Sequence, residues 1–569
     1  MDEFPTPPQH PRLLDRFLGV IERAPLSDRL GLRTLFFIAI AATLLLLIVI
    51  SGLFSGERGV SGGSFTEGML GMPRFVNPAL ALTRTDQDLT MLLYSGLMRI
   101  GADGSLTYDL AEDINLSEDG RTYTVKLREG STFHDGSAVT AADVLYTIRL
   151  VQDPALKSPV QGNWSQVDAQ AIDDYTLTIT LDEAYSPFIE NFTLGVMPAA
   201  QWRELLTEEL PFAPGNTQPT GSGPYQINKV ARDADGLIES YELIPHTTTR
   251  DTALIARITV DFFSNELELR EALVDQDIDA TAHLSVESLV TLDTDVWQIL
   301  SEPLPRIFGI FFNQNESVAL RDTAAREALG AVINRQTLID TTLASYGVPS
   351  TAPTVLTART VESAGATTSP AEILTEADWT QTDLGGWEKD INDETTRLSL
   401  TLRTSNTPLF ARVAEAISAD WRSAGVDVVV EQYEQSDLVQ GVIRPREFEA
   451  LLFGLDMSRS HDLYPFWHSS QQNDPGLNIS QYTNITVDDL LETARLEQNP
   501  VTREESLSEA SDIIVSESPA IFLFQPTLVY VVSKDIAVSP VVQPGRLADR
   551  FANVHLWYIE EESLWPFFK

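Results

Sequence analysis

The sequence predicts a mixed α/β protein that is held to a membrane by one N-terminal helix. Three observations lead to this fold class. Segments 123–127 and 175–181 alternate apolar and polar residues, which is typical of half-buried strands. A strand–helix–strand pattern over 397–430 indicates parallel strand pairing. A run over 35–54 carries no charge and is long enough to cross a bilayer.

The composition sets limits on the function. The chain has 569 residues, of which 43% are hydrophobic, so it can form full-sized cores and is not a largely disordered protein. Lys and Arg number 39 against 82 Asp and Glu, a net charge of −43 that repels nucleic-acid phosphates. Because cysteine is absent, disulfides, thiolate metal sites, cysteine nucleophiles and a lipid on an N-terminal cysteine are excluded.

The membrane run reads LFFIAIAATLLLLIVISGLF. At ~1.5 Å of rise per residue its helix spans ~30 Å, the thickness of the hydrocarbon core. We favour an uncleaved anchor over the alternative of a cleavable signal peptide, since the run exceeds the usual ~7–15 apolar residues and lacks an A-x-A site. Whether the chain is cut within 55–63 is left open by the sequence. Positive residues stay cytoplasmic, so residues 1–34 are expected inside and the bulk of the chain outside. The arginines before the run are Arg12, Arg16, Arg23, Arg29 and Arg33.

Residues 55–64 follow the run and are rich in Gly and Ser, which predicts a short flexible linker. A G-x-S-x-G string occurs within them at 59–63. A nucleophile elbow requires a strand before the serine and a helix after it. We therefore interpret the string as part of the linker.

Further elements follow from local patterns. Thr140 and Asp143 form a capping-box-like start, and the helix that follows carries an apolar stripe. In the strand–helix–strand unit, Gly425 ends a helix whose inner face includes Trp421, and a strand over 426–430 returns. Residues 450–453 predict another buried strand. The segment 351–396 has little core signal, and we expect a solvated, loop-rich excursion there.

Patterns that indicate catalysis or cofactors are weak. The chain has no Gly-Lys pair, which excludes a P-loop, and no HExxH string. His461 and His468, with Asp462 between them, form only a weak metal-ligand pattern because no cysteine accompanies them. Acidic residues are so numerous that no pair stands out as an acid/base couple. We predict neither an enzyme nor a cofactor.

Several short sequence motifs occur in a defined order along the chain. They are Asn77-Pro78, Asp103-Gly-Ser-Leu106, Leu110-Ala-Glu-Asp-Ile114, Ser117-Glu-Asp-Gly-Arg-Thr-Tyr123, Phe133-His-Asp-Gly136, Thr140-Ala-Ala-Asp-Val144, Gly221-Ser-Gly-Pro-Tyr225, Asn313, Ile333-Asn-Arg335, Asp462-Leu-Tyr-Pro-Phe-Trp-His-Ser469 and Pro519. From about residue 65 to about 560 the chain resembles the family 5 extracellular solute-binding proteins, the peptide, nickel and oligosaccharide receptors of ABC importers. The block 103–144 is the most specific part. The chain departs from many relatives in using a helix where they carry a lipidated cysteine.

The resemblance implies the large, three-subdomain type II periplasmic-binding-protein fold, in which two lobes close on a ligand. Lobe I is expected over 65–310, lobe II over 311–522, and a C-terminal return to lobe I over 523–569. The hinge is expected near 308–313 and 521–524, which are short apolar runs suited to crossing strands.

The resemblance also implies ligand contacts. In peptide-binding relatives a lobe II aspartate pairs with the ligand's α-ammonium, so Asp456 is the first candidate and Asp462 the second. The alternatives are a solvated loop acid for Asp456 and a helix N-cap for Asp462. Trp467 either walls the pocket or packs in a core, and Tyr225 either reaches the cleft or packs.

These features predict a membrane-anchored receptor that delivers a peptide or similar solute to an ABC permease, with ATP hydrolysis in separate subunits. The alternative is a solute sensor or surface chaperone with the same fold and no permease. The identity of the solute is left open by the sequence.

Overall fold

The computed structural model divides the chain into two compact units, residues 1–60 with 560–569, and residues 61–559. Each unit is described by itself. The residues that the structure describes are 25, 31, 34–35, 37–43, 56–247, 252–354, 369–559 and 561–564.

In the first unit, strand β1 (Gly56–Gly59) pairs antiparallel with β23 (Glu561–Leu564), so that Gly56 lies opposite Leu564. Residues 37–43 are helical. The predicted membrane run over 35–54 is only partly covered, because residues 36 and 44–54 lie outside the described residues. Most of the predicted cytoplasmic segment 1–34 also lies outside them. Within the described part of the chain, no helix is both long enough and apolar enough to span a bilayer.

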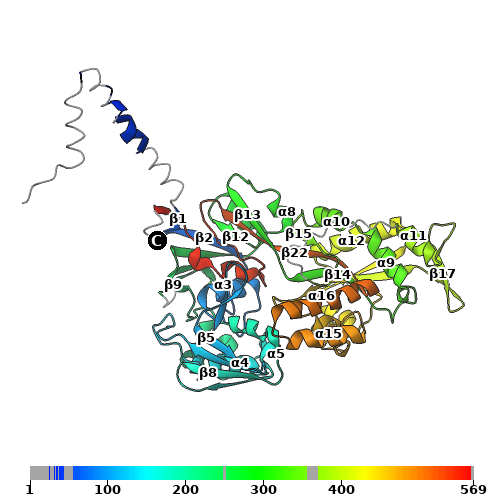
Figure 1. Ribbon diagram of the computed structural model, residues 1–569, viewed down its shortest axis with the longest axis horizontal. Helices are drawn as coiled ribbons and strands as arrows, with labels where there is room; N and C mark the ends of the chain where they lie inside the picture. Colours follow the sequence, from blue (N-terminus) through cyan, green and yellow to red (C-terminus); the bar gives the residue numbers. More distant parts are fainter. Residues whose placement is uncertain are drawn as a thin grey trace, which may run out of the picture. The chain divides into compact units, whose positions relative to one another are not determined.

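The second unit is organised around a sheet of 12 strands (Figure 1). Its main path runs β20-β19-β21-β14-β22-β12-β2-β11-β10-β9, and β13 and β15 pair with β22. The bounds are β2 (Gly62–Leu70), β9 (Tyr225–Arg232), β10 (Ile238–Pro245), β11 (Ile255–Phe263), β12 (Ala280–Thr281), β13 (Trp297–Pro303), β14 (Arg306–Phe312), β15 (Gly347–Pro349), β19 (Ser399–Ser405), β20 (Asp427–Tyr433), β21 (Ala450–Asp456) and β22 (Ala520–Ser533).

Strand β22 joins the two halves of this sheet. Its first residues pair with β14, where Ile310 lies opposite Ile521. Its last residues pair with β12 and β13, where Trp297 lies opposite Ser533. Figure 1 shows β22 running between the half that contains β12 and the half that contains β14.

Among the described residues, the buried apolar side chains form four clusters, which we group into two regions. The first core region draws on residues 65–304 and 528–557. The second core region draws on residues 307–524. Between them the chain crosses within 304–307 and 524–528, at β14 and in the middle of β22.

The helices of the first core region are α3 (Arg84–Leu93), α4 (Ala141–Gln152), α5 (Gln161–Trp164), α6 (Ala199–Trp202), α7 (Glu266–Val274) and α8 (Val286–Leu289). A small sheet in the order β5-β6-β8-β7 also belongs to it. Its strands are β5 (Ala111–Leu116), β6 (Thr122–Leu127), β7 (Val167–Ala171) and β8 (Thr176–Leu181), and a further pair is β3 (Met98–Ile100) with β4 (Leu106–Tyr108). The predicted strands over 123–127 and 175–181 are thus confirmed.

Helix α4 begins as its sequence predicts. The backbone N–H and the hydroxyl of Thr140 both donate to the carboxylate of Asp143, at 2.9 and 2.8 Å. The predicted apolar stripe is buried, with Val151 at 0% exposure. A capped start and one buried face together fix this helix against the core.

The helices of the second core region are α9 (Thr323–Val332), α10 (Arg335–Thr342), α11 (Pro370–Glu376), α12 (Pro408–Ser423), α13 (Gln435–Leu438), α14 (Tyr464–Trp467), α15 (Ile485–Leu496) and α16 (Pro500–Glu517). Strands β19 and β20 pair in parallel across α12, which confirms the α/β prediction. Gly425 follows α12 with φ +88°, a left-handed conformation that glycine adopts without strain.

The excursion over 351–396 is more ordered than the sequence predicts. Residues 355–368 lie outside the described residues, but α11 and a sheet of β16 (Thr380–Gln381), β17 (Trp387–Ile391) and β18 (Glu394–Arg397) follow. Trp379 donates from Nε1 to Asp322 at 3.0 Å, and Trp387 donates to the carbonyl of Ala424 at 2.9 Å. These two buried tryptophans attach the segment to the second core region, so the prediction of a solvated, loop-rich excursion was wrong for residues 370–396.

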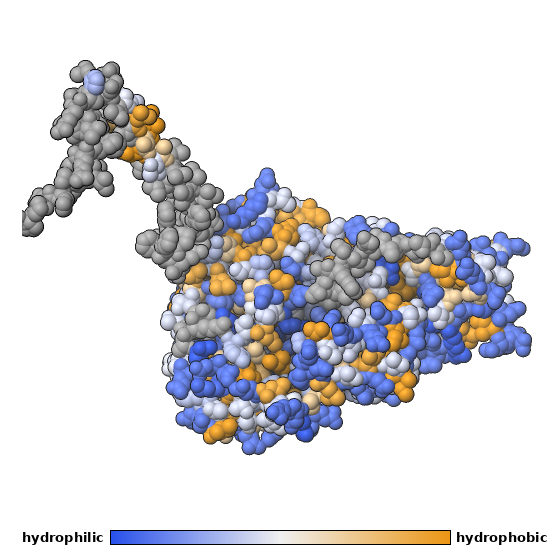
Figure 2. Space-filling model, viewed as in Figure 1, coloured by the Kyte–Doolittle hydropathy of each residue, from blue (hydrophilic) through white to orange (hydrophobic). Residues whose placement is uncertain are grey.

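The visible surface agrees with the composition. Figure 2 shows hydrophilic residues over most of the viewed face, with apolar residues in scattered groups. A surface of this kind, with a net charge of −43, favours solubility and weak self-association.

Candidate functional site

A cavity of about 970 Å³ lies between the two core regions. One wall comes from α3, from the 3-10 helix η1 (Ser186–Thr193) and from residues near the 3-10 helix η7 (Leu547–Phe551), all in the first core region. The other wall comes from the end of β21, from α14 and from α15, in the second. A volume of this size suits a small-molecule or peptide ligand.

The lining mixes aromatic rings with charges. Six carboxylates and three guanidinium groups line the cavity. They are Asp182, Glu183, Glu190, Asp456, Glu492, Asp549, Arg459, Arg495 and Arg546. Acidic groups are thus in excess, and such a cavity favours a ligand that carries a cationic group.

Asp456 is the candidate that lies in the cavity wall. It ends β21, and its Oδ2 accepts from Nε of Arg306 at 2.8 Å, while Oδ1 accepts from the backbone N–H of Ser458 at 3.2 Å. The side chain is 53% exposed. A carboxylate has about four acceptor positions, so this one can still receive a ligand's ammonium group.

Asp462 lies behind the wall. It is 6% exposed and is not among the residues that line the cavity. Its Oδ1 accepts from the backbone N–H of Tyr464 at 3.1 Å. The N-cap of α14 is Leu463, so Asp462 does not occupy the N-cap position weighed from the sequence. Its Oδ2 accepts from Nε of Arg495 at 3.0 Å and from the hydroxyl of Tyr185 at 3.1 Å. Asp462 therefore positions two side chains that do line the cavity.

Trp467 and Tyr225 lie in cores. Trp467 is 1% exposed, and its ring packs against Phe311, Tyr482 and Phe522. Tyr225 is 0% exposed and donates to the carbonyl of Ile255 at 3.1 Å. Neither side chain reaches the cavity in this structure. Both positions agree with the packing alternative, and contact with a ligand stays a prediction.

Arg459 connects the two core regions at the edge of the cavity. Its Nη1 donates to the carbonyls of Gly104 and Gln543, at 3.1 and 3.0 Å. Its Nη2 donates to Oδ2 of Asp549 at 2.8 Å. Asp549 is buried in η7 and also accepts from the backbone N–H of Gly545. These bonds hold the loop that follows β21 against the cavity wall formed by the first core region.

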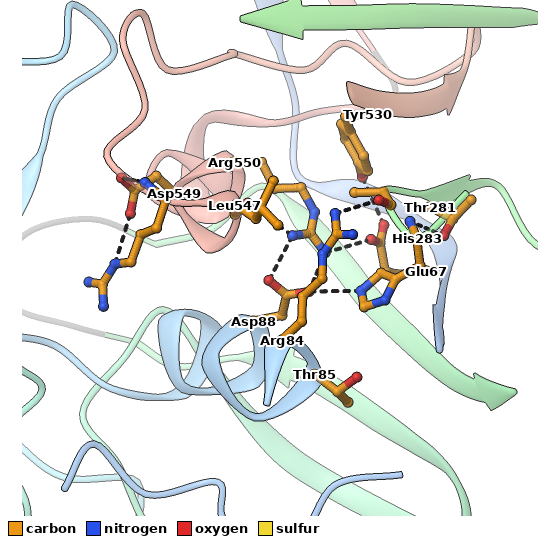
Figure 3. Close-up of polar contacts among 12 residues, drawn as sticks. Glu67, Arg84, Thr85, Asp88, Thr281, His283, Tyr530, Leu547, Asp549 and Arg550 are labelled. Atoms are coloured by element: carbon orange, nitrogen blue, oxygen red, sulfur yellow. Dashed lines mark hydrogen bonds and ion pairs between the residues drawn. The ribbon is translucent and has the colours of Figure 1, made fainter. Parts of the chain in front are cut away.

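A buried network fixes η7 in place (Figure 3). Arg550 donates to both carboxylate oxygens of Asp88, each at 2.7 Å, and to Glu67 at 3.1 Å. Tyr530 donates to the other oxygen of Glu67 at 2.8 Å, and His283 contacts Asp88 at 3.0 Å. The network thereby joins η7 to α3, β2, β22 and the residues after β12.

Burial and charge act against each other on these groups. Burial raises the pKa of Glu67 to about 6, although Arg550 opposes the shift. Burial also acts to raise the pKa of Asp88, but the Arg550 guanidinium and the His283 bond outweigh it and hold that pKa well below its usual range. Burial lowers the pKa of His283 to about 4, so His283 is neutral at pH 7.

Glu190 lines the cavity, and no sequence pattern marks it. It lies on η1, and burial raises the pKa of its carboxyl to about 7, against the opposing charges of Arg459 and Arg503. Arg459, Arg495 and Tyr185 were missed in the same way. Each lies far along the chain from its partners, so no local motif marks it. Only Arg459 had a local signal, since it lies in the loop that follows β21.

The chain is similar in sequence to a known protein family and to several of its members. Residues 105–476 match the family model described as bacterial extracellular solute-binding proteins, family 5 middle. Protein XP55 of Streptomyces lividans is 27% identical over 478 residues, which cover 82% of this chain and 84% of that protein. The oligopeptide-binding protein AppA of Bacillus subtilis (strain 168) is 23% identical over 515 residues, which cover 83% of this chain and 88% of AppA.

Two solved structures show the fold. AppA from Bacillus subtilis, in complex with a nonapeptide, matches with a TM-score of 0.64 and 20% identity, over 88% of this chain and 100% of that one. The unliganded, open form of the periplasmic murein tripeptide-binding protein MppA matches with a TM-score of 0.71 and 20% identity, over 89% and 98%. The fold is the α/β type II periplasmic-binding-protein fold.

Proposed function

The chain belongs to the family 5 bacterial extracellular solute-binding proteins, and we propose that its cavity captures a peptide or similar solute for an ABC importer. Members of this family are binding receptors and not enzymes. ATP hydrolysis belongs to other subunits, since this chain has no P-loop. The nonapeptide bound to AppA, an oligopeptide-binding protein to which this chain is similar, supports a peptide as the solute.

The observation that carries the proposal is the position of the cavity. It takes its walls from both core regions, and the chain crosses between those regions within 304–307 and 524–528. We propose that the two core regions are the two lobes. Ile307, Ile310, Leu523 and Phe524 pack in the second core region, so the proposed lobe boundaries fall within 304–307 and 524–528, a few residues from those expected from the sequence. A ligand that contacts both lobes favours the closed arrangement, and this differential affinity drives closure.

Asp456 is proposed as the contact for the ligand's ammonium group, because it lies in the wall with half of its side chain exposed. Asp462 is proposed to act through Arg495 and Tyr185. A peptide main chain would add further hydrogen bonds in extended form, which gives affinity with little side-chain selectivity.

The N-terminal part is proposed to anchor the receptor. Residues 1–34 would lie in the cytoplasm, 35–54 would span the membrane, and 55–64 would link the span to the binding unit. The uncharged run and the five arginines before it support this orientation.

Two measurements test the proposal on the full-length protein in detergent. Native mass spectrometry of the purified chain should show a retained peptide or similar solute. A library of tri- to nonapeptides should raise the melting temperature, because a ligand that binds the folded state stabilises it by mass action. A folded sample that shows no retained solute and no thermal shift would contradict the proposal. Recovery of permease and ATPase subunits from native membranes supports import, and their absence supports the sensor alternative.

A further inference from the structure

Strands β1 and β23 bring two distant parts of the chain together directly after the predicted membrane run. They pair antiparallel, with Gly59 opposite Glu561 and Gly56 opposite Leu564. The residues that precede Gly56 and those that follow Leu564 therefore continue from the same end of the pair. The predicted run ends at residue 54. Since two residues span at most ~7 Å and paired strands lie ~4.8 Å apart, Leu564 lies within about 12 Å of the end of the run.

The other end of the pair continues into the second unit at a single place. That unit covers residues 61–559, so the chain enters it just after Gly59 and leaves it just before Glu561. Inside the unit its two ends lie side by side, because a Cβ at Gly63 would lie 2.9 Å from Cδ1 of Ile559. Two paired strands therefore connect the second unit with the part of the chain that contains the run.

A pair of strands this short needs support at both ends. Strands β1 and β23 have 4 residues each, and an isolated two-stranded ribbon is marginally stable at best in water. Beyond Glu561 the chain is held by the second unit, where Ile559 packs against the first core region. At the end that carries Gly56 and Leu564, support has to come from the segments that continue from the pair there.

The residues after β23 have the composition of a segment that lies at a membrane surface. Residues 565–569, which are outside the described residues, read WPFFK. Trp is enriched at the level of the lipid headgroups because its ring is apolar and its N–H is polar. Trp and Phe together with a basic residue are typical of segments in the lipid interface. Glu560, Glu561 and Glu562 come before them, so the chain changes from acidic to aromatic toward the end of the pair that adjoins the membrane run.

We propose that residues 565–569 insert into the lipid interface beside the membrane run and give the receptor a second attachment to the bilayer. The run fixes Gly56 at the bilayer surface, the pairing carries that position over to Leu564, and the aromatic segment enters the headgroup layer within a reach of ~17 Å. Two paired strands limit tilt and rotation more than a single flexible linker does, so the binding unit keeps a restricted range of orientations toward the membrane. The inference rests on the membrane anchor proposed above.

The full-length protein in vesicles tests this inference, because the chain has no cysteine and one introduced cysteine carries a single label. Three variants are labelled with the fluorophore bimane. They are Phe567→Cys in the proposed segment, Leu45→Cys in the membrane run, and Leu384→Cys as the control, since Leu384 is 97% exposed in the second unit. The vesicles contain equal parts of phosphatidylcholine and phosphatidylglycerol, with added lipids that carry a nitroxide quencher either near the headgroup or deep in the acyl chain.

The three labels should report three depths. We expect quenching at residue 45 mainly by the deep nitroxide, and quenching at residue 567 mainly by the shallow one, with emission shifted to shorter wavelength. Neither nitroxide should quench the label at residue 384.

Replacing the neighbouring aromatic residues tests whether they cause the insertion. Trp565→Ser combined with Phe568→Ser should remove the quenching and the spectral shift at residue 567. The matched control combines Leu206→Ser with Phe212→Ser, two apolar residues of the second unit that are 65% and 85% exposed. It should leave both signals unchanged.

The outcomes separate this inference from the anchor on which it rests. Deep quenching at residue 45, without quenching at residue 567 above that at residue 384, overturns the second attachment and leaves the anchor in place. Absence of quenching at residue 45 overturns the anchor, and this inference with it. Quenching at residue 567 that survives the loss of both aromatic neighbours means that the pairing alone holds the segment near the bilayer, which overturns the insertion. If Phe567→Cys does not fold, as judged by circular dichroism, Trp565→Cys provides the label position.

Discussion

His134 and Gly221 are joined by two hydrogen bonds. The backbone N–H of His134 donates to the carbonyl of Gly221 at 2.8 Å, and the backbone N–H of Gly221 donates to Nδ1 of His134 at 3.2 Å. Because Nδ1 accepts, the proton of the neutral ring lies on Nε2, which contacts the carbonyl of Gly223 at 3.3 Å. The contact joins two of the sequence motifs that carry the family resemblance, 133–136 and 221–225.

The first prediction concerns the pH dependence of stability. Burial, together with the neighbouring His246, lowers the pKa of His134 to about 4, below the ~6.5 of an unfolded histidine. On acidification the unfolded state therefore takes up the proton first, and stability is lost as the pH falls from about 6.5 to about 4. In His134→Gln this loss should be smaller, by up to about 1.4 kcal/mol per pH unit. Urea unfolding followed by circular dichroism at pH 7, 6, 5 and 4.5 measures the slope, and an unchanged slope would refute the assignment.

The second prediction concerns Gly221. A Cβ at this position would lie 1.8 Å from the carbonyl oxygen of Leu93, a backbone atom that cannot move aside alone. Gly221→Ala should destabilise the protein by about 3 kcal/mol or more, at the upper end of overpacking effects. At Gly441 a Cβ would meet no atom within 4 Å, so Gly441→Ala is the control and should leave stability unchanged or slightly higher. Equal midpoints in denaturant for the two variants would contradict this account.

Much of the local structure followed from patterns within about a dozen residues. The capping pair Thr140 and Asp143, the alternation in β6 and β8, and the β19–α12–β20 unit all occur where the sequence predicts them. In each case one buried face and one terminal signal suffice, because both are set by residues close in the chain.

The site depended on contacts that no local pattern carries. Asp462 is 33 positions from Arg495 and 277 from Tyr185, and the bond to Tyr185 forms only when the two core regions meet. From the sequence, an aspartate before a helix is either a cap or a ligand contact. In the structure Leu463 is the N-cap of α14, and Asp462 binds the backbone N–H of Tyr464 and positions the guanidinium of Arg495 at the cavity. The excursion over 351–396 was misjudged because its order depends on two tryptophans that pack outside the segment.

The third prediction concerns Arg550, which lies between two buried carboxylates. Arg550→Met would leave Asp88 and Glu67 without their cation at 0% exposure. Removing one partner from a buried ion pair costs about 3–5 kcal/mol. Arg397→Met is the control: its pair with Glu388 has 78% exposure on the arginine, and such pairs contribute roughly 0–1 kcal/mol. The loss in Arg550→Met should shrink between pH 7 and pH 5, since Glu67 then becomes protonated. A loss of stability smaller than that of the control, or a loss that grows on acidification, would show that the two buried carboxylates do not depend on the charge of Arg550.

The fourth prediction concerns Arg459, which joins the two core regions. Arg459→Ala removes three hydrogen bonds, each of which contributes roughly 1 kcal/mol, so the open arrangement should gain roughly 100-fold in population. Small-angle X-ray scattering of the unliganded protein should then give a larger radius of gyration. Arg444→Ala is the control, because Arg444 is 53% exposed and its contacts with Asp474 at 3.6 Å and Gln440 at 3.1 Å stay within the second core region. Identical scattering from the wild type and Arg459→Ala would mean that these bonds do not hold the regions together.

The last prediction concerns Asp456 and separates binding from stability. Its partner Arg306 is 37% exposed and the carboxylate 53%, so Asp456→Asn should change the free energy of unfolding by no more than about 1 kcal/mol. The asparagine keeps the shape of the side chain but loses the charge that pairs with an ammonium group. Affinity for peptides with a free N-terminus should therefore fall about 10- to 100-fold. N-acetylated peptides lack the ammonium group, and the wild type and the variant should bind them equally. Asp474→Asn, outside the cavity, is the control and should keep full affinity. Loss of affinity for free and acetylated peptides alike would instead place Asp456 among the residues that shape the wall, and retention of both would remove it from the site.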